Sequence, residues 1–119
     1  MRLALPLAAL AAIAMPASAA PEPTRLTVTL SSFQYAPDVI RLVHGRPYVL
    51  HLVNGSSRGH NFVAPGFMAA AGLDRRGVEV PGQSALDLAF TAPGPGSYKL
   101  KCTHFSHAML GMRGRIIVE

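Results

Sequence analysis

The chain has 119 residues, of which 50% are hydrophobic, with 11 Lys and Arg against 6 Asp and Glu and a single cysteine. This length allows one compact domain and argues against catalysis in a large substrate cleft. A lone cysteine excludes an intramolecular disulfide and a CxxC redox pair. Eleven Gly, ten Pro, 7% aromatic residues and no Trp are typical of a turn-rich, all-β chain rather than of a helical bundle.

Residues 1–19 have the pattern of a secretory signal peptide. A positively charged start precedes an apolar run over residues 3–15, which is shorter than the ~20 residues that a membrane-spanning helix needs. Small residues follow in an A-x-A cleavage pattern, so we expect a cut after Ala19 or Ala20. The sequence therefore predicts a domain over residues 20–119 that is periplasmic or otherwise exported, with no integral membrane segment once the signal is removed.

Removal of the signal changes the charge of the domain. One Arg is lost with residues 1–19, so the net charge falls from +5 to +4, with 10 basic against 6 acidic residues. A positive charge of this size can steer the domain towards acidic protein surfaces or anionic lipid. Its basic residues are scattered along the sequence, which argues against nucleic acid as a partner. In an oxidising compartment, one unpaired cysteine is expected to be either buried and inert or bound to a metal.

The exported part is predicted to form about eight short strands in a Greek-key sandwich or barrel. Residues 26–30 alternate with polar neighbours as a half-buried strand does, and residues 48–53 are the most strand-like run of all. Residues 67–76 contain three consecutive Ala and are expected to form one or two helical turns. The remaining strands are expected at 33–35, 39–43, 78–80, 85–90, 97–102 and 115–118, with a brief apolar pair at 62–63.

Ligand types for soft metals gather between Cys102 and Met112, a stretch that also contains two histidines and a second methionine. A catalytic cysteine–histidine dyad would need an orienting group and a cleft, and neither is evident. A zinc site would make no use of the methionines. Thiolate, imidazole and thioether are the ligand types that copper takes together, and two His, one Cys and a distant Met define the blue-copper arrangement. The further histidine can come from His44, His51 or His60.

Two motifs make the chain resemble a known family. Residues 59–62 read Gly-His-Asn-Phe, and four residues separate Cys102 from His107 and His107 from Met112. Both features resemble the ligand motifs of the cupredoxins, the small blue-copper proteins. Further similar stretches are FQYAP at 33–37, VPGQ at 80–83, APGPGSY at 92–98 and GMRGRIIV at 111–118. The resemblance covers residues 24–118, almost the whole exported part.

The resemblance implies a site for one copper ion, with His60, Cys102 and His107 as equatorial ligands and Met112 as the weak axial ligand. It also implies that Asn61 ties the His60 segment to the loop after Cys102 by hydrogen bonds.

The sequence departs from the family pattern between Cys102 and His107, where many relatives carry a loop containing Pro-Gly. His104 is an additional imidazole and Met109 an additional thioether in this region, so a copper contact from either of them stays open. His44 and His51 are expected to be structural or surface residues.

The resemblance implies a protein that is no enzyme but carries single electrons by Cu(II)/Cu(I) cycling, as a monomer. Its partners are expected to be redox proteins such as a cytochrome or an oxidoreductase. They are expected to dock on an apolar collar around His107, formed by Ala108, Met109 and Leu110. The alternative, motivated by His104 and Met109, is a copper-binding or copper-delivery protein without a dedicated electron-transfer role.

Overall fold

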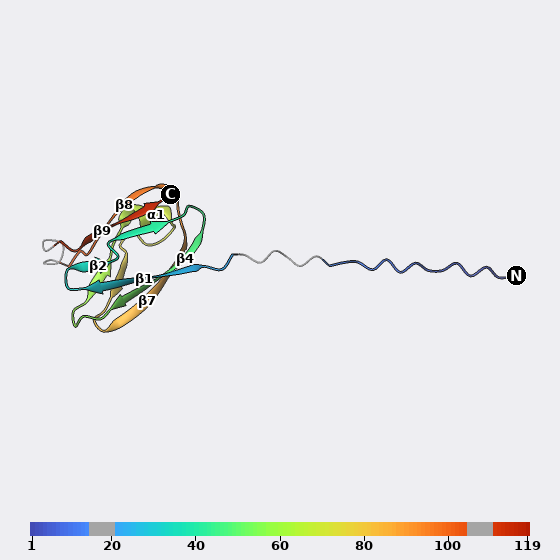
Figure 1. The fold of residues 1–119 in the computed structure, drawn as a ribbon, viewed down its shortest axis with the longest axis horizontal. Coiled ribbons are helices and arrows are strands. Elements are labelled where there is room, and N and C mark those ends of the chain that lie inside the picture. The colour runs from blue at the N-terminus through green and yellow to red at the C-terminus, as the bar shows by residue number, and fades with distance from the viewer. Residues whose placement is uncertain (15–20, 105–110) are drawn as a thin grey trace.

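The structure is a computed structural model that describes residues 1–14, 21–104 and 111–119. Residues 1–14 are exposed, form no helix or strand, and lead away from the domain (Figure 1). The expected cleavage position lies outside the described residues, as do His107 and its collar. No helix among the residues described is long and apolar enough to cross a membrane.

The first sheet has four strands in the order β2-β1-β4-β7. The long strand β4 lies at its centre, parallel to β1 and antiparallel to β7. Every second residue of β4, beginning at Tyr48, is buried, which matches the period-two pattern of its sequence. The bounds are β1 (Thr24–Ser31), β2 (Gln34–Ala36), β4 (Pro47–Asn54) and β7 (Ser84–Thr91).

The second sheet has three strands in the order β3-β9-β8, with β9 (Arg113–Val118) at its centre. Strand β3 (Val39–Leu42) is parallel to β9, and β8 (Gly96–Lys101) is antiparallel to it. A third, two-stranded sheet joins β5 (His60–Phe62) to β6 (Val78–Val80). A bridge between Val63 and Lys101 attaches the end of β5 to the end of β8.

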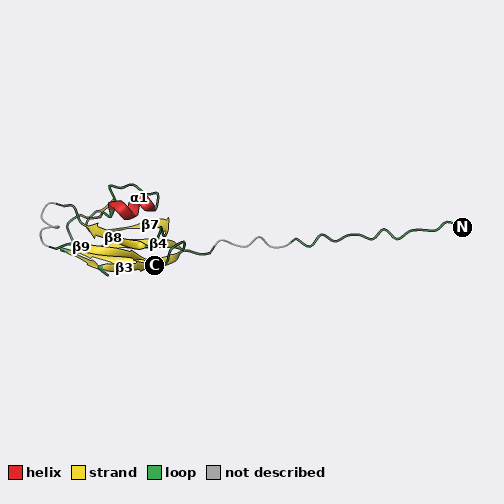
Figure 2. Ribbon diagram, turned by 90° about the horizontal axis from the view of Figure 1, so that it is seen from above, coloured by secondary structure: helices red, strands yellow, loops and turns green. Residues whose placement is uncertain are grey.

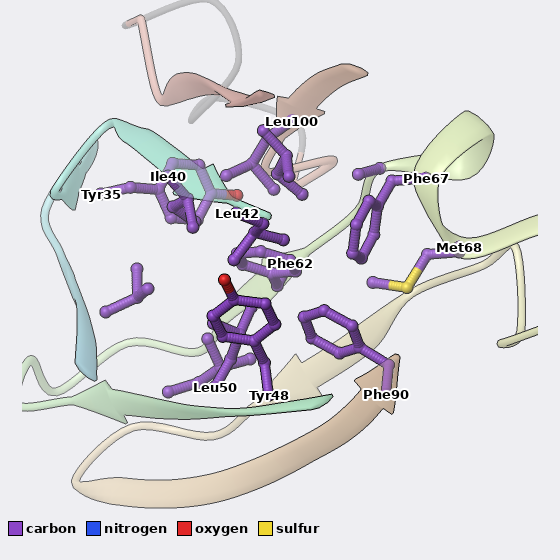
Figure 3. Packing of buried hydrophobic residues seen from close by; sticks show 14 of the residues in the cluster. Tyr35, Ile40, Leu42, Tyr48, Leu50, Phe62, Phe67, Met68, Phe90 and Leu100 are labelled. Carbon is purple, nitrogen blue, oxygen red and sulfur yellow. The ribbon is translucent and has the colours of Figure 1, made fainter. Parts of the chain in front are cut away.

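The core fills the space between the sheets and beneath the one short helix, α1 (Pro65–Ala70). Figure 2 shows this helix to one side of the strands. Its buried residue Phe67 packs edge-on against Phe90 of β7 and Tyr98 of β8, with ring centroids 5.0 and 5.6 Å apart. Figure 3 shows these helix side chains beside residues from both sheets. The helix therefore closes one side of the core.

The all-β prediction is confirmed, with nine strands among the described residues in place of about eight. The expected helical turns exist but occupy residues 65–70 rather than 67–76. The helix can begin earlier because Pro65 is well suited to its first turn. It ends early because Gly72 adopts a positive φ of 73°, which stops a right-handed helix. Phe33 also has a positive φ and belongs to a turn, so β2 begins one residue later than predicted.

Candidate metal centre

Two of the predicted sulfur ligands lie at one end of the β8–β9 hairpin. Cys102 directly follows β8 and Met112 directly precedes β9. The backbone N–H of Cys102 donates to the carbonyl of Met112 at 3.2 Å, which places the two residues side by side. Both side chains are fully buried. Residues ten apart in sequence thus bring a thiol and a thioether to the same end of the core.

His60 is also buried, and a polar chain from the end of β4 fixes the orientation of its ring. The Nε2 atom of His60 lies 3.0 Å from Oγ of Ser56. That hydroxyl contacts two further oxygens, Oδ1 of Asn54 at 2.6 Å and the carbonyl of Arg58 at 3.0 Å. Both are acceptors, so the single hydroxyl hydrogen points to them and Nε2 of His60 must be the donor. In the neutral ring the lone pair is therefore on Nδ1.

The orientation of Asn54 is equally determined. Its Nδ2 donates to the carbonyls of Arg58 at 2.8 Å and Val80 at 2.9 Å, so its Oδ1 is the acceptor that faces Ser56. Asn54 is 1% exposed and uses both ends of its amide. An amide buried and saturated in this way holds the loop at residues 55–59 in one conformation.

The VPGQ stretch at residues 80–83 supports the same loop from the other side. The backbone N–H of Gln83 donates to the carbonyl of Ser56 at 3.0 Å, and its side chain donates to the carbonyl of Gly55 at 2.8 Å. At Gly82 a Cβ would come within 2.4 Å of the carbonyl oxygen of Ser57, so only glycine fits there. This motif therefore fixes the loop at residues 55–59, which precedes His60.

Asn61 connects the His60 segment to the residue after Cys102, as predicted. Its Oδ1 accepts from the backbone N–H of Thr103 at 2.8 Å, and its Nδ2 donates to Oγ1 of Thr103 at 2.7 Å. The carbonyl of Asn61 accepts from the hydroxyl of Tyr35 at 2.6 Å. Burial, and then the proximity of Cys102, raise the pKa of Tyr35, so this hydroxyl stays a neutral donor. The segments that hold the predicted ligands His60 and Cys102 are thus fixed to each other and to the core.

Glu79 extends this network to the surface. Its carboxylate accepts from Nδ2 of Asn61 at 2.9 Å and contacts Nε2 of His104 at 2.9 Å. Burial opposes ionisation of Glu79, but the hydrogen bonds from Asn61 and His104 outweigh it and lower the pKa. The imidazole of His104 is therefore held beside a carboxylate at the edge of the centre.

The other candidate histidines lie in structural contacts. Nδ1 of His44 lies 2.8 Å from the carbonyl of Pro93. Nδ1 of His51 lies 2.6 Å from the carboxylate of Asp87 on the neighbouring strand β7, and Arg25 of β1 bonds the same carboxylate. These contacts account for His44 and His51 without a metal, as expected.

Hydrogen bonds join the segment of His60, through Asn61, to the residue after Cys102, and join Cys102 to Met112, while His107 falls outside the described residues. In the part of the chain that the structure describes, no three His, Cys, Asp or Glu side chains are grouped as a metal site. The predicted set contains three such residues, but only His60 and Cys102 are among the described ones, because His107 lies outside them and Met112 is a thioether donor. Sequence reasoning missed Ser56 and Asn54, whose only signal was a turn-like Asn-Gly-Ser-Ser.

A β fold of two main sheets and a small third one, with buried sulfur and imidazole residues, defines a small cupredoxin-type domain. The chain matches the family described as "Cupredoxin-like domain" over residues 3–118, and it belongs to this family. The comparison with curated proteins gave no match.

Solved structures with the same fold include single-domain copper proteins. Auracyanin B is 20% identical with a TM-score of 0.67, over 85% of this chain and 93% of that chain. Amicyanin from Paracoccus versutus is 24% identical with a TM-score of 0.58, over 86% of each chain. The fold also occurs within a larger enzyme, the blue copper oxidase of Nitrosomonas europaea. That oxidase is 17% identical with a TM-score of 0.68, over 82% of this chain and 39% of that chain.

The family implies copper, and the described donors fit it. A residue with a buried thiol and one with a buried thioether are joined by a backbone hydrogen bond, and a buried imidazole in its neutral form carries its lone pair on Nδ1. These are the soft ligand types that suit copper. The hydrogen bond from Nε2 of His60 to Ser56 is the kind of contact that orients a histidine ligand.

Proposed function

We propose that this protein is a type 1 copper protein that carries single electrons between redox partners. His60, Cys102 and His107 would be the equatorial ligands, and Met112 the axial ligand. The observation that supports this most is the hydrogen-bonded link through Asn61, which holds the His60 and Cys102 segments together without using a ligand atom. Once bound, copper would supply a Cu(II)/Cu(I) couple.

The chain itself contributes rigidity around that couple. The Asn54–Ser56 chain fixes the ring of His60, and the β8–β9 ladder fixes Cys102 against Met112. Ligands that keep their positions need little rearrangement when the charge at the centre changes. Burial of the sulfur atoms excludes water. The reduction potential would then be set by the axial thioether and by the hydrogen bonds around the thiolate.

A copper-delivery role is the alternative, and it depends on extra exposed ligands such as His104 and Met109. The contact between His104 and Glu79 favours the electron-carrier proposal, because Nε2 of this imidazole is already held against a carboxylate. Met109 lies outside the described residues. Rapid transfer of Cu(I) to a chelating acceptor, without redox turnover by cytochromes, would support delivery instead.

The further expectations also stand as proposals. The protein would be exported through the signal at residues 1–19 and would act as a monomer in the periplasm. Redox proteins such as a cytochrome or oxidoreductase would be its partners. The apolar collar of Ala108, Met109 and Leu110 would be the docking patch for these partners, and His107 would be the point of electron exchange.

The first test is the visible absorption and EPR spectrum of the purified protein after addition of Cu(II). We expect an intense thiolate-to-copper charge-transfer band and narrow copper hyperfine splitting. Cys102→Ser should remove the band, and Met112→Leu should keep the copper but raise its reduction potential. A pale, ordinary Cu(II) spectrum, or an intense band retained in Cys102→Ser, would refute the ligand assignment.

A further inference from the structure

Four cations form a compact group on the outer face of the β8–β9 hairpin. In the antiparallel register Lys99 lies opposite Arg115, and Lys101 lies opposite Arg113. All four are exposed, while Leu100, between the two lysines, and Ile116, next to Arg115, are buried in the core. Because alternate residues of a strand share a face, the four side chains project from the same side. We call these four residues the cation ladder.

None of the four cations forms a salt bridge with a residue that the structure describes. Arg41 on β3, in the same sheet, differs from them because its guanidinium forms a salt bridge with Glu119 at 3.0 Å. The guanidinium of Arg115 donates a hydrogen bond to an uncharged acceptor, Oγ of Ser97, at 3.1 Å. Like charges directly opposite each other destabilise a sheet. The two pairs, Lys99 with Arg115 and Lys101 with Arg113, are therefore both unfavourable for folding.

Protection of a sheet edge explains only half of this arrangement. Strand β8 lies at the edge of its sheet, and lysines on an edge strand discourage pairing with another molecule. Strand β9 is central and has no open edge, yet it carries Arg113 and Arg115. The two arginines therefore need another reason, and binding of an anionic group supplies one.

The surface around the ladder is hollowed. A depression of about 510 Å³ is lined by the four cations together with Leu100 and Gly114. A second depression of about 410 Å³ adjoins it across β8, between Pro65 of α1 and Tyr98, and shares Lys99 and Lys101 as lining residues. Concave surfaces lined by cations fit protruding carboxylate side chains and focus the positive field on them.

We propose that the cation ladder is a second docking surface, separate in sequence from the collar at residues 108–110, and that it binds a carboxylate-rich face of a partner protein. The identity of that partner as a redox protein rests on the proposed electron-carrier function. Lys101 directly precedes Cys102 and Arg113 directly follows Met112, so the inner pair of the ladder adjoins two proposed copper ligands in the chain. Figure 1 shows β8 and β9 side by side. A partner bound there would lie next to the proposed metal centre.

A protein partner fits the face better than a lipid surface does. Helices and faces that bind membranes combine cations with exposed Trp, Phe or Leu that enter the lipid. Strands β3, β8 and β9 carry no exposed residue of these three types, and Val39 is the exposed large apolar residue among them. The face therefore provides charge and concavity, but not apolar anchors.

The direct test measures binding of fluorescently labelled poly-L-glutamate to the purified protein by anisotropy at low ionic strength. We expect the variant Lys99→Glu/Arg115→Glu to raise the Kd at least about tenfold, since two attractive contacts become repulsive. The control Arg46→Glu/Arg75→Glu has the same change in net charge at exposed positions outside β8 and β9, and should change the Kd less than about threefold. Equal losses in the two variants would overturn the proposal, because only net charge would then matter.

Vesicles of phosphatidylcholine with one third phosphatidylglycerol separate the lipid alternative. If the ladder variant lost vesicle binding but kept its affinity for polyglutamate, the face would bind lipid and the proposal would be wrong. Far-UV circular dichroism should show that both variants are folded. This test needs no copper, so it stands even if the chain proves not to form a type 1 site.

A second readout uses small redox reagents on the copper-loaded protein. The variant Lys101→Glu/Arg113→Glu should slow oxidation by ferricyanide, an anion, and accelerate oxidation by a cationic cobalt(III) complex. An unchanged blue absorption band would show that the metal centre is intact. Unchanged rates with both reagents would overturn the link between ladder and centre, whereas absence of a blue band in the unmodified protein would refute the proposed function instead.

Discussion

The hydrogen bonds of Asn61 to Thr103 should contribute measurably to the stability of the metal-free protein. Asn61→Ala removes three side-chain hydrogen bonds, two to Thr103 and one to Glu79. At about 1 kcal/mol for each bond, the expected loss is about 2–3 kcal/mol. For a domain of this size, 1 kcal/mol corresponds to about 4–8 °C in Tm, so the midpoint should fall by about 10–20 °C.

A double-mutant cycle isolates the contact between the two segments. Thr103→Val removes only the hydroxyl that accepts from Asn61, and should cost about 1 kcal/mol. The two changes together should cost less than the sum of the single changes, with a coupling of about 0.5–1.5 kcal/mol in urea unfolding. A coupling below about 0.3 kcal/mol would show that the hydrogen bond does not join the segments. The metal-free protein is used because bound metal would add its own stabilisation.

Three further changes test other parts of the structure. Ser56→Ala removes the hydroxyl that accepts from Nε2 of His60, and should weaken Cu(II) binding about 10- to 100-fold in a chelator competition. Unchanged affinity would contradict the role of this hydrogen bond in orienting His60 as a ligand. Gly77→Ala should cost more than about 2 kcal/mol in urea unfolding, because its Cβ would lie 2.3 Å from a carbonyl oxygen of β5 at a positive φ. Gly72→Ala, with a similar φ and open space, should cost clearly less, and equal costs would disprove the steric argument. Hydrogen bonds from His51 of β4 and Arg25 of β1 lower the pKa of Asp87 from 3.8. The stabilising contribution of Asp87 is therefore present above pH 3.8 and is lost as the pH falls through the lowered pKa. Asp87→Asn should therefore lower the Tm at pH 7 but not at about pH 2, and a penalty that persists in acid would contradict this.

Local pattern was sufficient to predict most of the strands. Alternation in residues 26–30 and 48–53 predicts half-buried strands, and both are found at the centre of the first sheet. The helix was less predictable, because three Ala residues favour a helix without fixing its ends. Its limits depend on Pro65 and on the positive φ of Gly72, both set by how the segment packs on the core.

The candidate site was predictable where it depends on spacing within one segment. Cys102 and Met112 end up adjacent because the strands beside them pair in register, and the resemblance already implied the link through Asn61. The support of His60 by Ser56 was not predictable. It depends on a loop conformation that Asn54 and Gln83 impose through contacts between segments remote in sequence.

The β8–β9 hairpin unites the two properties on which the proposed function depends. Its buried face and its end place Cys102 and Met112 in the core, while its outer face carries the cation ladder. The alternation of a strand makes this separation automatic, because neighbouring residues point to opposite sides. A charged partner can therefore bind next to the proposed ligands without any charged side chain entering the core. Substitutions on the outer face should accordingly change association with partners and leave the absorption spectrum unaltered, and substitutions at the ligands should do the reverse.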